Sequence, residues 1–242
     1  MKHSFIDKYS DLDSPIHRLD PRTKLVLGLA FVLTLVLIPQ RAWPTFGIAL
    51  GLLLIVALLS RVPLLYLLSR SAAVIPFAFL VTFFRVIPQG EEGLVAGAII
   101  GAKAWLSALA LVLISATTPF PLLLKGMEKL KMPQELVLVL SFMYRYIFVL
   151  LDEAMRMERA WASRGAGRNW WASFKAMAGV VGVLFMRSYE RAERVYQAML
   201  ARGFEGEVRT LNPLKFSTAD LAFGLASALG LGVLWVVIAL WR

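Results

Sequence analysis

Cysteine is absent from the 242-residue chain, and histidine occurs twice, as His3 and His17. Without cysteine the chain has no disulfide, no thiolate metal site and no cysteine nucleophile. Both histidines lie in a polar N-terminal segment outside any histidine-rich tract, so we interpret His17 as a surface or packing residue and predict no metal site. A Gly-x-x-x-x-Gly-Lys-Ser/Thr loop is also absent, so any dependence on ATP must come from a partner.

Acidic residues are scarce as well: 16 Asp and Glu stand against 26 Lys and Arg, which gives a formal net charge of +10. Such an excess is typical of proteins that bind nucleic acid or anionic lipid, and of the cytoplasmic loops of membrane proteins. Here the basic residues are dispersed among apolar segments and form no recognisable nucleic-acid-binding module. We therefore attribute the charge to membrane topology and predict no nucleic-acid partner.

Apolar residues are abundant, at 59% of the sequence compared with roughly 45–50% in soluble domains. Several continuous runs rich in Leu, Ala and Val approach the ~20 residues that a helix needs to cross the ~30 Å hydrocarbon core. They lack the alternation of apolar and polar residues that is typical of a β-barrel strand. The composition therefore predicts an all-α, polytopic helical membrane protein in contact with the lipid bilayer.

Prolines and charges divide the chain into segments. A polar, interfacial segment (1–22) is followed by four transmembrane helices within 23–118, at about 24–38, 44–59, 64–86 and 94–116, and a fifth lies within 218–242, at about 220–241. The third helix is expected to kink at Pro76. Residues 119–217 form the predicted cytoplasmic coupling region between the fourth and fifth membrane helices.

Lys103 is the only charge in the fourth predicted span. A role in substrate or proton transfer competes with snorkelling or pairing against another helix, because an intramembrane charge costs about 3 kcal/mol. No carboxylate in a neighbouring span offers a proton relay. We therefore favour the structural role and leave Lys103 out of the predicted site.

The basic residues also predict the orientation of the chain. Lys125, Lys129 and Lys131 mark a cytoplasmic link with a short amphipathic helix, whereas Glu91 and Glu92 fall on the outer side. Four predicted spans separate this link from the N-terminus. The N-terminus is therefore predicted to be cytoplasmic too.

Two long helices are predicted in the coupling region, at about 134–164 and 171–202. Each has an apolar first half and a charged second half, although Arg145 interrupts the apolar half of the first. The apolar halves lie either in the membrane or along it, which leaves a total of five to seven spans. We adopt about five transmembrane helices and treat the two long helices as cytoplasmic.

Carboxylates on these helices have an ordinary explanation. Asp152 with Arg156 and Glu190 with Arg194 are four residues apart and are expected to pair along solvated faces. Asp152 and Glu153 are neighbours in sequence and point in different directions on a helix. We therefore predict no catalytic residue.

Both long helices end on an Arg-Gly pair, in Ala162-Ser163-Arg164-Gly165 and in Ala201-Arg202-Gly203. Glycine is a common helix cap, and arginine in the last turn complements the helix dipole, so ordinary helix termination explains either end taken alone. Two such ends in one membrane protein favour docking of partners. The small residues let a partner's backbone approach, and the guanidinium offers a planar fork of donors.

The N-terminal block Ser14-Pro15-Ile16-His17-Arg18-Leu19-Asp20-Pro21-Arg22-Thr23-Lys24, the spans and the two helix ends together carry a resemblance. Over nearly its whole length the chain resembles the transmembrane T component of energy-coupling-factor (ECF) transporters, the CbiQ/EcfT family. The second helix end matches the family's Ala-Arg-Gly motif, whereas the first has Ser163 in place of alanine, a small change that still permits close approach.

The resemblance implies a non-catalytic subunit of an ATP-driven importer in a bacterial or archaeal cell (inner) membrane. Its partners would be two copies of an ABC-type ATPase (CbiO-like) and a substrate-binding membrane subunit (CbiM-like, with or without a CbiN-like protein). ATP and Mg²⁺ would bind to the ATPases and Co²⁺ to the substrate subunit, so no cofactor is expected in this chain. Each helix end would seat in a groove of one ATPase, with Arg164 and Arg202 as the main contacts. The neighbouring docking residues would be Ala162, Ser163, Gly165, Ala201 and Gly203.

The substrate expected from the resemblance is cobalt, because Ile6-Asp7-Lys8-Tyr9 before the N-terminal block is similar to the CbiQ branch, which is linked to cobalamin biosynthesis. A T subunit of a nickel- or vitamin-type transporter is the alternative. Two other classes stay open: a membrane enzyme acting on a lipid or prenyl substrate, and a membrane scaffold for non-transport partners. The enzyme predicts clustered carboxylates or a histidine at the membrane interface.

Overall fold

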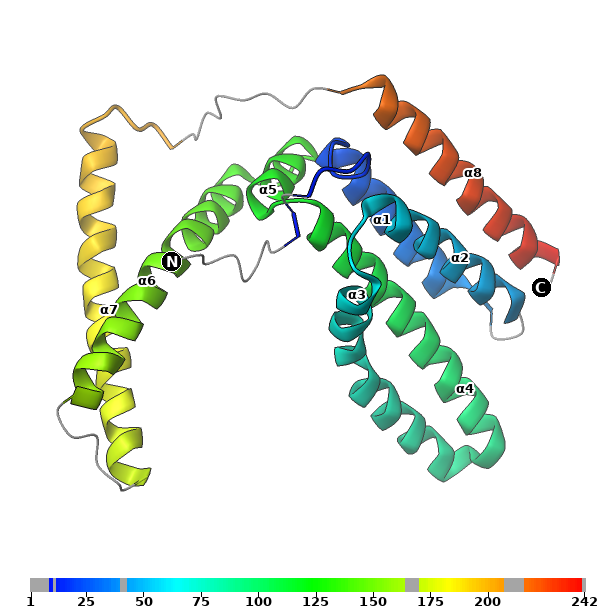
Figure 1. The fold of residues 1–242 in the computed structure, drawn as a ribbon, viewed down its shortest axis with the longest axis horizontal. Coiled ribbons are helices and arrows are strands. Elements are labelled where there is room, and N and C mark those ends of the chain that lie inside the picture. Colours follow the sequence, from blue (N-terminus) through cyan, green and yellow to red (C-terminus); the bar gives the residue numbers. More distant parts are fainter. Residues whose placement is uncertain (1–8, 11, 40–42, 164–169, 207–215, 241–242) are drawn as a thin grey trace. The chain divides into compact units, whose positions relative to one another are not determined.

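The computed structural model describes residues 9–10, 12–39, 43–163, 170–206 and 216–240. Helices dominate these residues, and no strand occurs among them (Figure 1). The helices are α1 (Pro21–Leu37), α2 (Trp43–Ser60), α3 (Leu64–Ser71), α4 (Ile75–Thr117), α5 (Phe120–Lys129), α6 (Gln134–Ser163), α7 (Trp170–Leu200) and α8 (Thr218–Leu240), with a 3-10 turn η1 (Ala72–Val74) before α4. The all-α class predicted from the sequence is confirmed.

The chain divides into two compact units. The first comprises Met1–Lys131 and Pro213–Arg242 and holds α1 to α5 together with α8. The second comprises Met132–Asn212 and holds α6 and α7.

Four helical stretches of the described chain are long and apolar enough to cross a membrane. They are Leu64–Pro88, Gly90–Thr117, Gln134–Ser163 and Thr218–Leu240, and Pro44–Ser60 is a shorter apolar helix. Three of the four coincide with predicted membrane helices. The predicted spans at 24–38 and 44–59 are the helices α1 and α2, of 17 and 18 residues. Gln134–Ser163 also meets the criterion of length and hydropathy, although we predicted it as a coupling helix.

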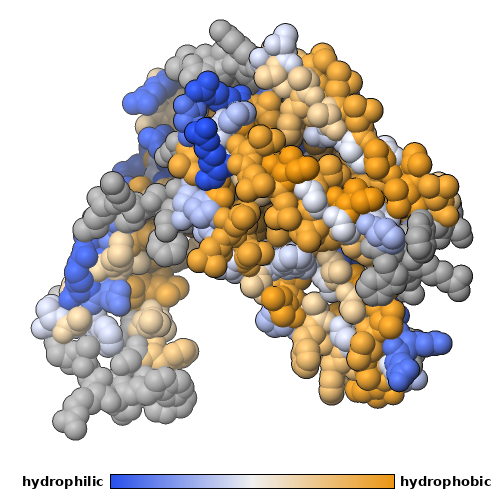
Figure 2. All heavy atoms as spheres, turned by 45° about the vertical axis from the view of Figure 1, so that its right-hand side comes forward, coloured by the Kyte–Doolittle hydropathy of each residue, from blue (hydrophilic) through white to orange (hydrophobic). Residues whose placement is uncertain are grey.

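The outer surface of the first unit is apolar. On the face drawn in Figure 2, hydrophobic side chains cover most of the unit. Among its apolar side chains, Leu29, Leu58 and Leu229 are between 62% and 72% exposed. Exposed apolar area of this extent is unfavourable in water but suits contact with lipid. The chain is therefore a multi-pass membrane protein.

A sharp reversal at Gly90 divides α4 into two antiparallel halves. Gly90 has φ +58° and ψ −127°, a conformation that glycine adopts without steric cost. The two halves then pack closely, because a Cβ added at Gly97 would lie 2.6 Å from the Cα of Thr82. This reversal lies between the third and fourth predicted spans, at 64–86 and 94–116. The third predicted span, expected to kink at Pro76, contains the 3-10 turn η1, which ends at Val74, and Pro76 lies in the first turn of α4.

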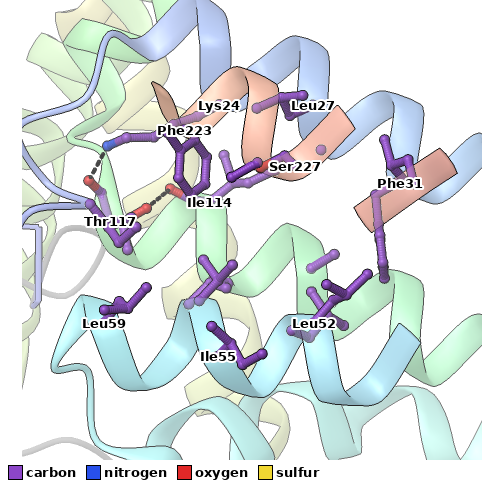
Figure 3. Close-up of a pocket in the computed structure, with 18 residues that line it drawn as sticks. Lys24, Leu27, Phe31, Leu52, Ile55, Leu59, Ile114, Thr117, Phe223 and Ser227 are labelled. Atoms are coloured by element: carbon purple, nitrogen blue, oxygen red, sulfur yellow. Dashed lines mark hydrogen bonds between the residues drawn. The ribbon is translucent and has the colours of Figure 1, made fainter. Parts of the chain in front are cut away.

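The first unit contains a half-open pocket of about 240 Å³. Helix α1 contacts α4 and α8, and α2 contacts the same two helices, so the four line the pocket. Figure 3 shows its apolar lining, to which α1 contributes Phe31, α2 contributes Leu52 and α4 contributes Ile114. Lys24 and Thr117 lie together at one end. The lining is therefore almost entirely hydrocarbon, with polar groups near that end.

Candidate functional site

The N-terminal block that carries the family resemblance folds into a tight turn before α1. The backbone N–H of His17 donates to the carbonyl of Ser14 at 3.0 Å. The hydroxyl of Ser14 lies 2.7 Å from His17 Nδ1, and His17 Nε2 lies 3.0 Å from the carbonyl of Tyr9. Because a carbonyl only accepts, Nε2 carries a proton and donates to Tyr9, and in the neutral ring Nδ1 then accepts from the hydroxyl of Ser14. Burial lowers the pKa of His17, against the opposing effect of the Tyr9 carbonyl.

Asp20 connects this turn to the start of α1 and to the start of α8. Its carboxylate caps α1 by accepting from the backbone N–H of Arg22 at 2.9 Å. Its own backbone N–H donates to the carboxylate of Asp220, at the start of α8, at 2.6 Å. Asp20 and Asp220 are both buried. A buried carboxylate needs such donors because it loses its hydration on folding.

Lys24 connects the same region to α4. Its side chain is buried, and its ammonium donates to the carbonyl of Thr117 at 2.9 Å (Figure 3). The ammonium also donates to the hydroxyl of Thr118 at 3.0 Å. A third and longer bond reaches the carbonyl of His17 at 3.4 Å. The three donors of the ammonium are therefore satisfied within the chain. The N-terminal block holds α1, α4 and α8 together at one end of the first unit.

Lys103 has a comparable structural role at the other end of α1. Its ammonium donates to the carbonyls of Val36 at 3.0 Å and Ile38 at 2.6 Å. These carbonyls lie at the C-terminal end of α1, where helices lack internal donors and carry partial negative charge. Lys103 of α4 therefore pairs with another helix, α1, which is the role favoured from the sequence.

Helices α6 and α7 of the second unit pack against each other in an antiparallel arrangement (Figure 1). Glu153 of α6 shares a groove with Arg187 of α7. A second groove contains Leu138, near the start of α6, and Met199, near the end of α7. The C-terminal ends of the two helices, where the predicted docking residues lie, are therefore at opposite ends of the pair.

The second Arg-Gly end forms a Schellman cap. The backbone N–H of Phe204 donates to the carbonyl of Met199 at 3.1 Å, and that of Gly203 donates to the carbonyl of Leu200 at 3.0 Å. Gly203 has φ +78°, the left-handed conformation that this cap requires. Phe204 and Met199 line the same groove, as is common for the apolar contact of the motif. Helix termination therefore accounts for the glycine at this position.

Arg202 is the cap residue before this glycine, and its side chain is exposed. Its backbone N–H donates to the carbonyl of Met199 at 3.0 Å, whereas its guanidinium has no hydrogen bond or ion pair among the described residues. Ala201 and Gly203 beside it are exposed too. The guanidinium is therefore presented at the helix end between two small residues. This arrangement leaves its planar fork of donors available to a carboxylate or to backbone carbonyls of another protein.

The first Arg-Gly end is described as far as Ser163. Ala162 and Ser163 are exposed in the last turn of α6, and the hydroxyl of Ser163 donates to the carbonyl of Ala160 at 3.0 Å. Arg164 and Gly165 lie outside the described residues. Arg145, on the apolar half of α6, is exposed.

One contact between the two long helices, Glu153 with Arg187, was not predicted from the sequence. The carboxylate of Glu153 accepts from Nε and Nη2 of Arg156 at 3.2 and 2.5 Å, and it also accepts from Arg187 of α7. The sequence predicts a pair of Arg156 with Asp152, four residues away. The structure gives Arg156 two bonds to Glu153, which is three residues away. The predicted pair of Glu190 with Arg194 is present at 3.8 Å. Nothing local in the sequence points to Arg187, because it is 34 residues from Glu153.

Comparison with known proteins places these features among transporter components. The family model described as "Cobalt transport protein" (CbiQ) matches residues 13–212. The energy-coupling factor transporter transmembrane protein EcfT of Heliobacterium modesticaldum is 32% identical, over 100% of this chain and 98% of its own. EcfT of Bacillus subtilis is 32% identical over 85% and 86%. The cobalt transport protein CbiQ of Rhodobacter capsulatus is 28% identical over 87% and 88%.

Proposed function

Because the chain belongs to the CbiQ family, as the transmembrane T component of an ECF transporter, we propose that it couples ATP hydrolysis in two partner ATPases to substrate uptake. The substrate would pass through a separate membrane subunit that binds it. The chain itself would contribute no catalytic group, and ATP and Mg²⁺ would bind to the ATPases. Its described helices would supply the mechanical link.

The observation that carries this proposal is the exposed Arg202 at the Schellman cap of α7, flanked by Ala201 and Gly203. Its charge has no partner within the described chain, and its backbone is fixed by the cap. An exposed and rigidly held arginine between small residues suits a groove that offers carboxylate or carbonyl acceptors. By the resemblance of the two sequences, Arg164 would present the same chemistry at the end of α6.

The antiparallel packing of α6 and α7 adds a geometric condition. Ser163 lies about 15 Å beyond the Glu153–Arg187 contact along α6, and Arg202 lies about 22 Å beyond it along α7, at ~1.5 Å per residue. The two ends thus point in opposite directions from the contact. Two ATPases on one side of the membrane can engage both ends if the helix pair lies along the membrane surface. We propose this orientation, with the N-terminus on the same cytoplasmic side.

Cobalt is the substrate we propose. The description of the matching family model and the name of the Rhodobacter relative support it. Nickel and a vitamin are the alternatives, since the EcfT relatives carry no substrate in their names. Among the described residues no group of three or more His, Cys, Asp or Glu has the arrangement of a metal site. We therefore propose that the separate substrate-binding subunit determines which substrate is transported.

The test is purification of the tagged chain from its native membrane in mild detergent, with the co-purifying proteins and their ratios measured by mass spectrometry. We expect two ATPase copies per chain together with a small membrane protein. In the double variant Arg164→Ala/Arg202→Ala the ATPases should be lost and uptake abolished, while the amount of chain in the membrane is unchanged. Uptake of radioactive cobalt, nickel and vitamins then identifies the substrate.

A matched control removes one positive charge from each of the same two helices, away from their Arg-Gly ends. Arg159→Ala/Arg194→Ala changes one exposed arginine on each helix outside the Arg-Gly ends. This control should retain the ATPases and uptake. If the Arg164→Ala/Arg202→Ala variant transports at normal membrane abundance, the docking proposal fails.

A further inference from the structure

The place where α6 crosses α7 is held by a carboxylate with two arginine partners. One oxygen of Glu153 accepts both bonds from Arg156 on its own helix, and the other oxygen accepts from Arg187 on α7. The Glu153 side chain is 16% exposed, whereas those of Arg156 and Arg187 are 57% and 59% exposed. The carboxylate is thus the least exposed member of the three and is oriented from both helices.

This contact differs from the other ion pairs described in the second unit. Glu153–Arg156 and Glu190–Arg194 each lie within one helix, whereas Glu153–Arg187 joins the two. Ion pairs that involve half-exposed side chains contribute little stability. Their hydrogen-bond geometry is nevertheless directional, since the carboxylate must lie in the plane of each guanidinium. The contact therefore sets the angle and register of the crossing more than the strength of packing.

The Glu153–Arg187 contact lies between the two helix ends, so the crossing angle of α6 and α7 affects how the two ends move relative to each other. Glu153 and Arg187 lie between the two Arg-Gly ends, and each end extends from the crossing along a different helix. A displacement imposed at one end by an ATPase rotates its helix about the crossing. The displacement reaches the other helix as a defined movement when the crossing is held in register, and is lost as slippage when it is not.

We propose that Glu153 is a positioning residue: together with Arg156 and Arg187 it holds the crossing of α6 and α7, so that movement at one ATPase-docking end is passed to the other helix. This inference rests on the proposed function. It predicts that loss of the contact uncouples ATP hydrolysis from uptake without preventing assembly of the transporter. An ion pair that merely adds stability would change neither the ratio of ATPases to T component nor the uptake per ATP hydrolysed once the complex is assembled.

The experiment uses the full transporter in proteoliposomes and compares Glu153→Gln, Arg187→Gln and the exchange Glu153→Arg/Arg187→Glu with the native chain. The ratio of ATPases to T component, the ATPase rate and the uptake per ATP hydrolysed are measured together. We expect full ATPase recovery in each variant. Uptake per ATP should fall roughly tenfold in both single variants, within the range typical of coupling between sites, and the exchange should restore most of it.

Glu190→Gln is the matched control, because it removes a carboxylate that pairs with an arginine within α7. It should behave like the native chain. The inference is overturned if Glu153→Gln and Arg187→Gln couple as well as Glu190→Gln, or if the exchange is as defective as the single variants. Absence of the ATPases from the native complex would instead refute the proposed function.

A distance measurement gives a readout that does not depend on transport. Because the chain has no cysteine, Ala160→Cys and Ala198→Cys introduce a unique pair of spin labels near the two helix ends. In the nucleotide-free complex, Glu153→Gln should broaden the distance distribution between the labels, and Glu190→Gln should leave it unchanged. An unchanged distribution in Glu153→Gln contradicts the proposed positioning role.

Discussion

The backbone N–H of Asp20 donates a 2.6 Å hydrogen bond to the carboxylate of Asp220, although the two residues are 200 positions apart. The other oxygen of Asp220 accepts from the backbone N–H of Ser217 at 2.7 Å. Ser217 directly precedes α8, so this second bond is one half of a capping box at the helix start. One carboxylate thus caps α8 and fixes the turn before α1 against it.

Asp220→Asn should destabilise the first unit. An asparagine amide offers one accepting oxygen in place of two, and its NH₂ group would face a backbone N–H donor. We expect a loss of about 1–3 kcal/mol, the usual cost of an unsatisfied buried group, measured as a lower midpoint of thermal unfolding in detergent. Asp13→Asn is the control, because Asp13 pairs with Arg18 at a site where both side chains are 75% exposed. Equal effects of the two substitutions would contradict the proposed role of Asp220.

Lys24→Met should cost more stability than Lys103→Met. Both lysines donate to backbone carbonyls, but Lys24 is 5% exposed and lies near the buried carboxylates of Asp20 and Asp220. Its removal leaves the Thr117 carbonyl without that donor and takes a buried cation away from Asp220 and Asp20, although Asp20 keeps Arg22 at 3.9 Å. We expect about 2–3 kcal/mol for Lys24→Met and about 1 kcal/mol for Lys103→Met. Denaturation of the two variants in the same detergent measures the order, and a reversed order would show that burial is not the controlling factor.

The stability of the N-terminal turn should fall as the pH drops below about 6.5, the ordinary pKa of histidine. Burial lowers the pKa of His17 in the folded chain, so between the folded and unfolded pKa values the unfolded chain binds more protons. Stability is therefore full above the unfolded pKa and decreases as protonation of the unfolded state sets in. Thermal unfolding of the native chain and of His17→Gln across this range measures it. The pH dependence should be smaller in the variant, and an identical slope in both would refute the assignment to His17.

Much of the secondary structure could be predicted because its signals are local. The helices predicted at 134–164 and 171–202 are Gln134–Ser163 and Trp170–Leu200, since unbroken helical sequence and terminal glycine specify such elements without tertiary context. The reversal at Gly90 lies in the gap between the spans predicted at 64–86 and 94–116, where Glu91 and Glu92 interrupt the apolar sequence. Long-range contacts carried no comparable signal. Burial of Lys24 depends on residues 93 and 94 positions away, which no local pattern encodes.

For the candidate site, too, local features could be predicted from the sequence, whereas features that depend on helix packing could not. The capping role of Gly203 followed from its place after a helix, and the exposure of Arg202 agrees with a docking role that stays a prediction. The antiparallel arrangement of the two ends could not be predicted, because it arises from the packing of α6 on α7. The partner of Glu153 across the helix pair was missed for the same reason.

Gly203→Ala should weaken ATPase docking at the second end. An L-residue in the left-handed conformation at φ +78° costs about 1–2 kcal/mol, so the cap is expected to open and the Arg202 backbone to lose its fixed direction. The measurement is ATPase recovered per chain after purification. Gly206→Ala is the control, because Gly206 also has a positive φ, of +92°, but lies outside the cap. Normal recovery with Gly203→Ala would mean that the direction of Arg202 is unimportant.

Labels near both ends of the helix pair should be accessible from the cytoplasm. Single cysteines at Ala160 and Ala198 would report the two C-terminal regions of α6 and α7, in a chain that has no cysteine of its own. Gln134–Ser163 is long and apolar enough to span a membrane, and because α7 is antiparallel to it, a spanning pair would carry the two labels to opposite sides. Docking on two cytoplasmic ATPases requires both on one side. A membrane-impermeant maleimide should therefore label neither cysteine in intact cells and both in inverted vesicles. Labelling of one cysteine from each side would make α6 a membrane span and exclude simultaneous docking of the two ends.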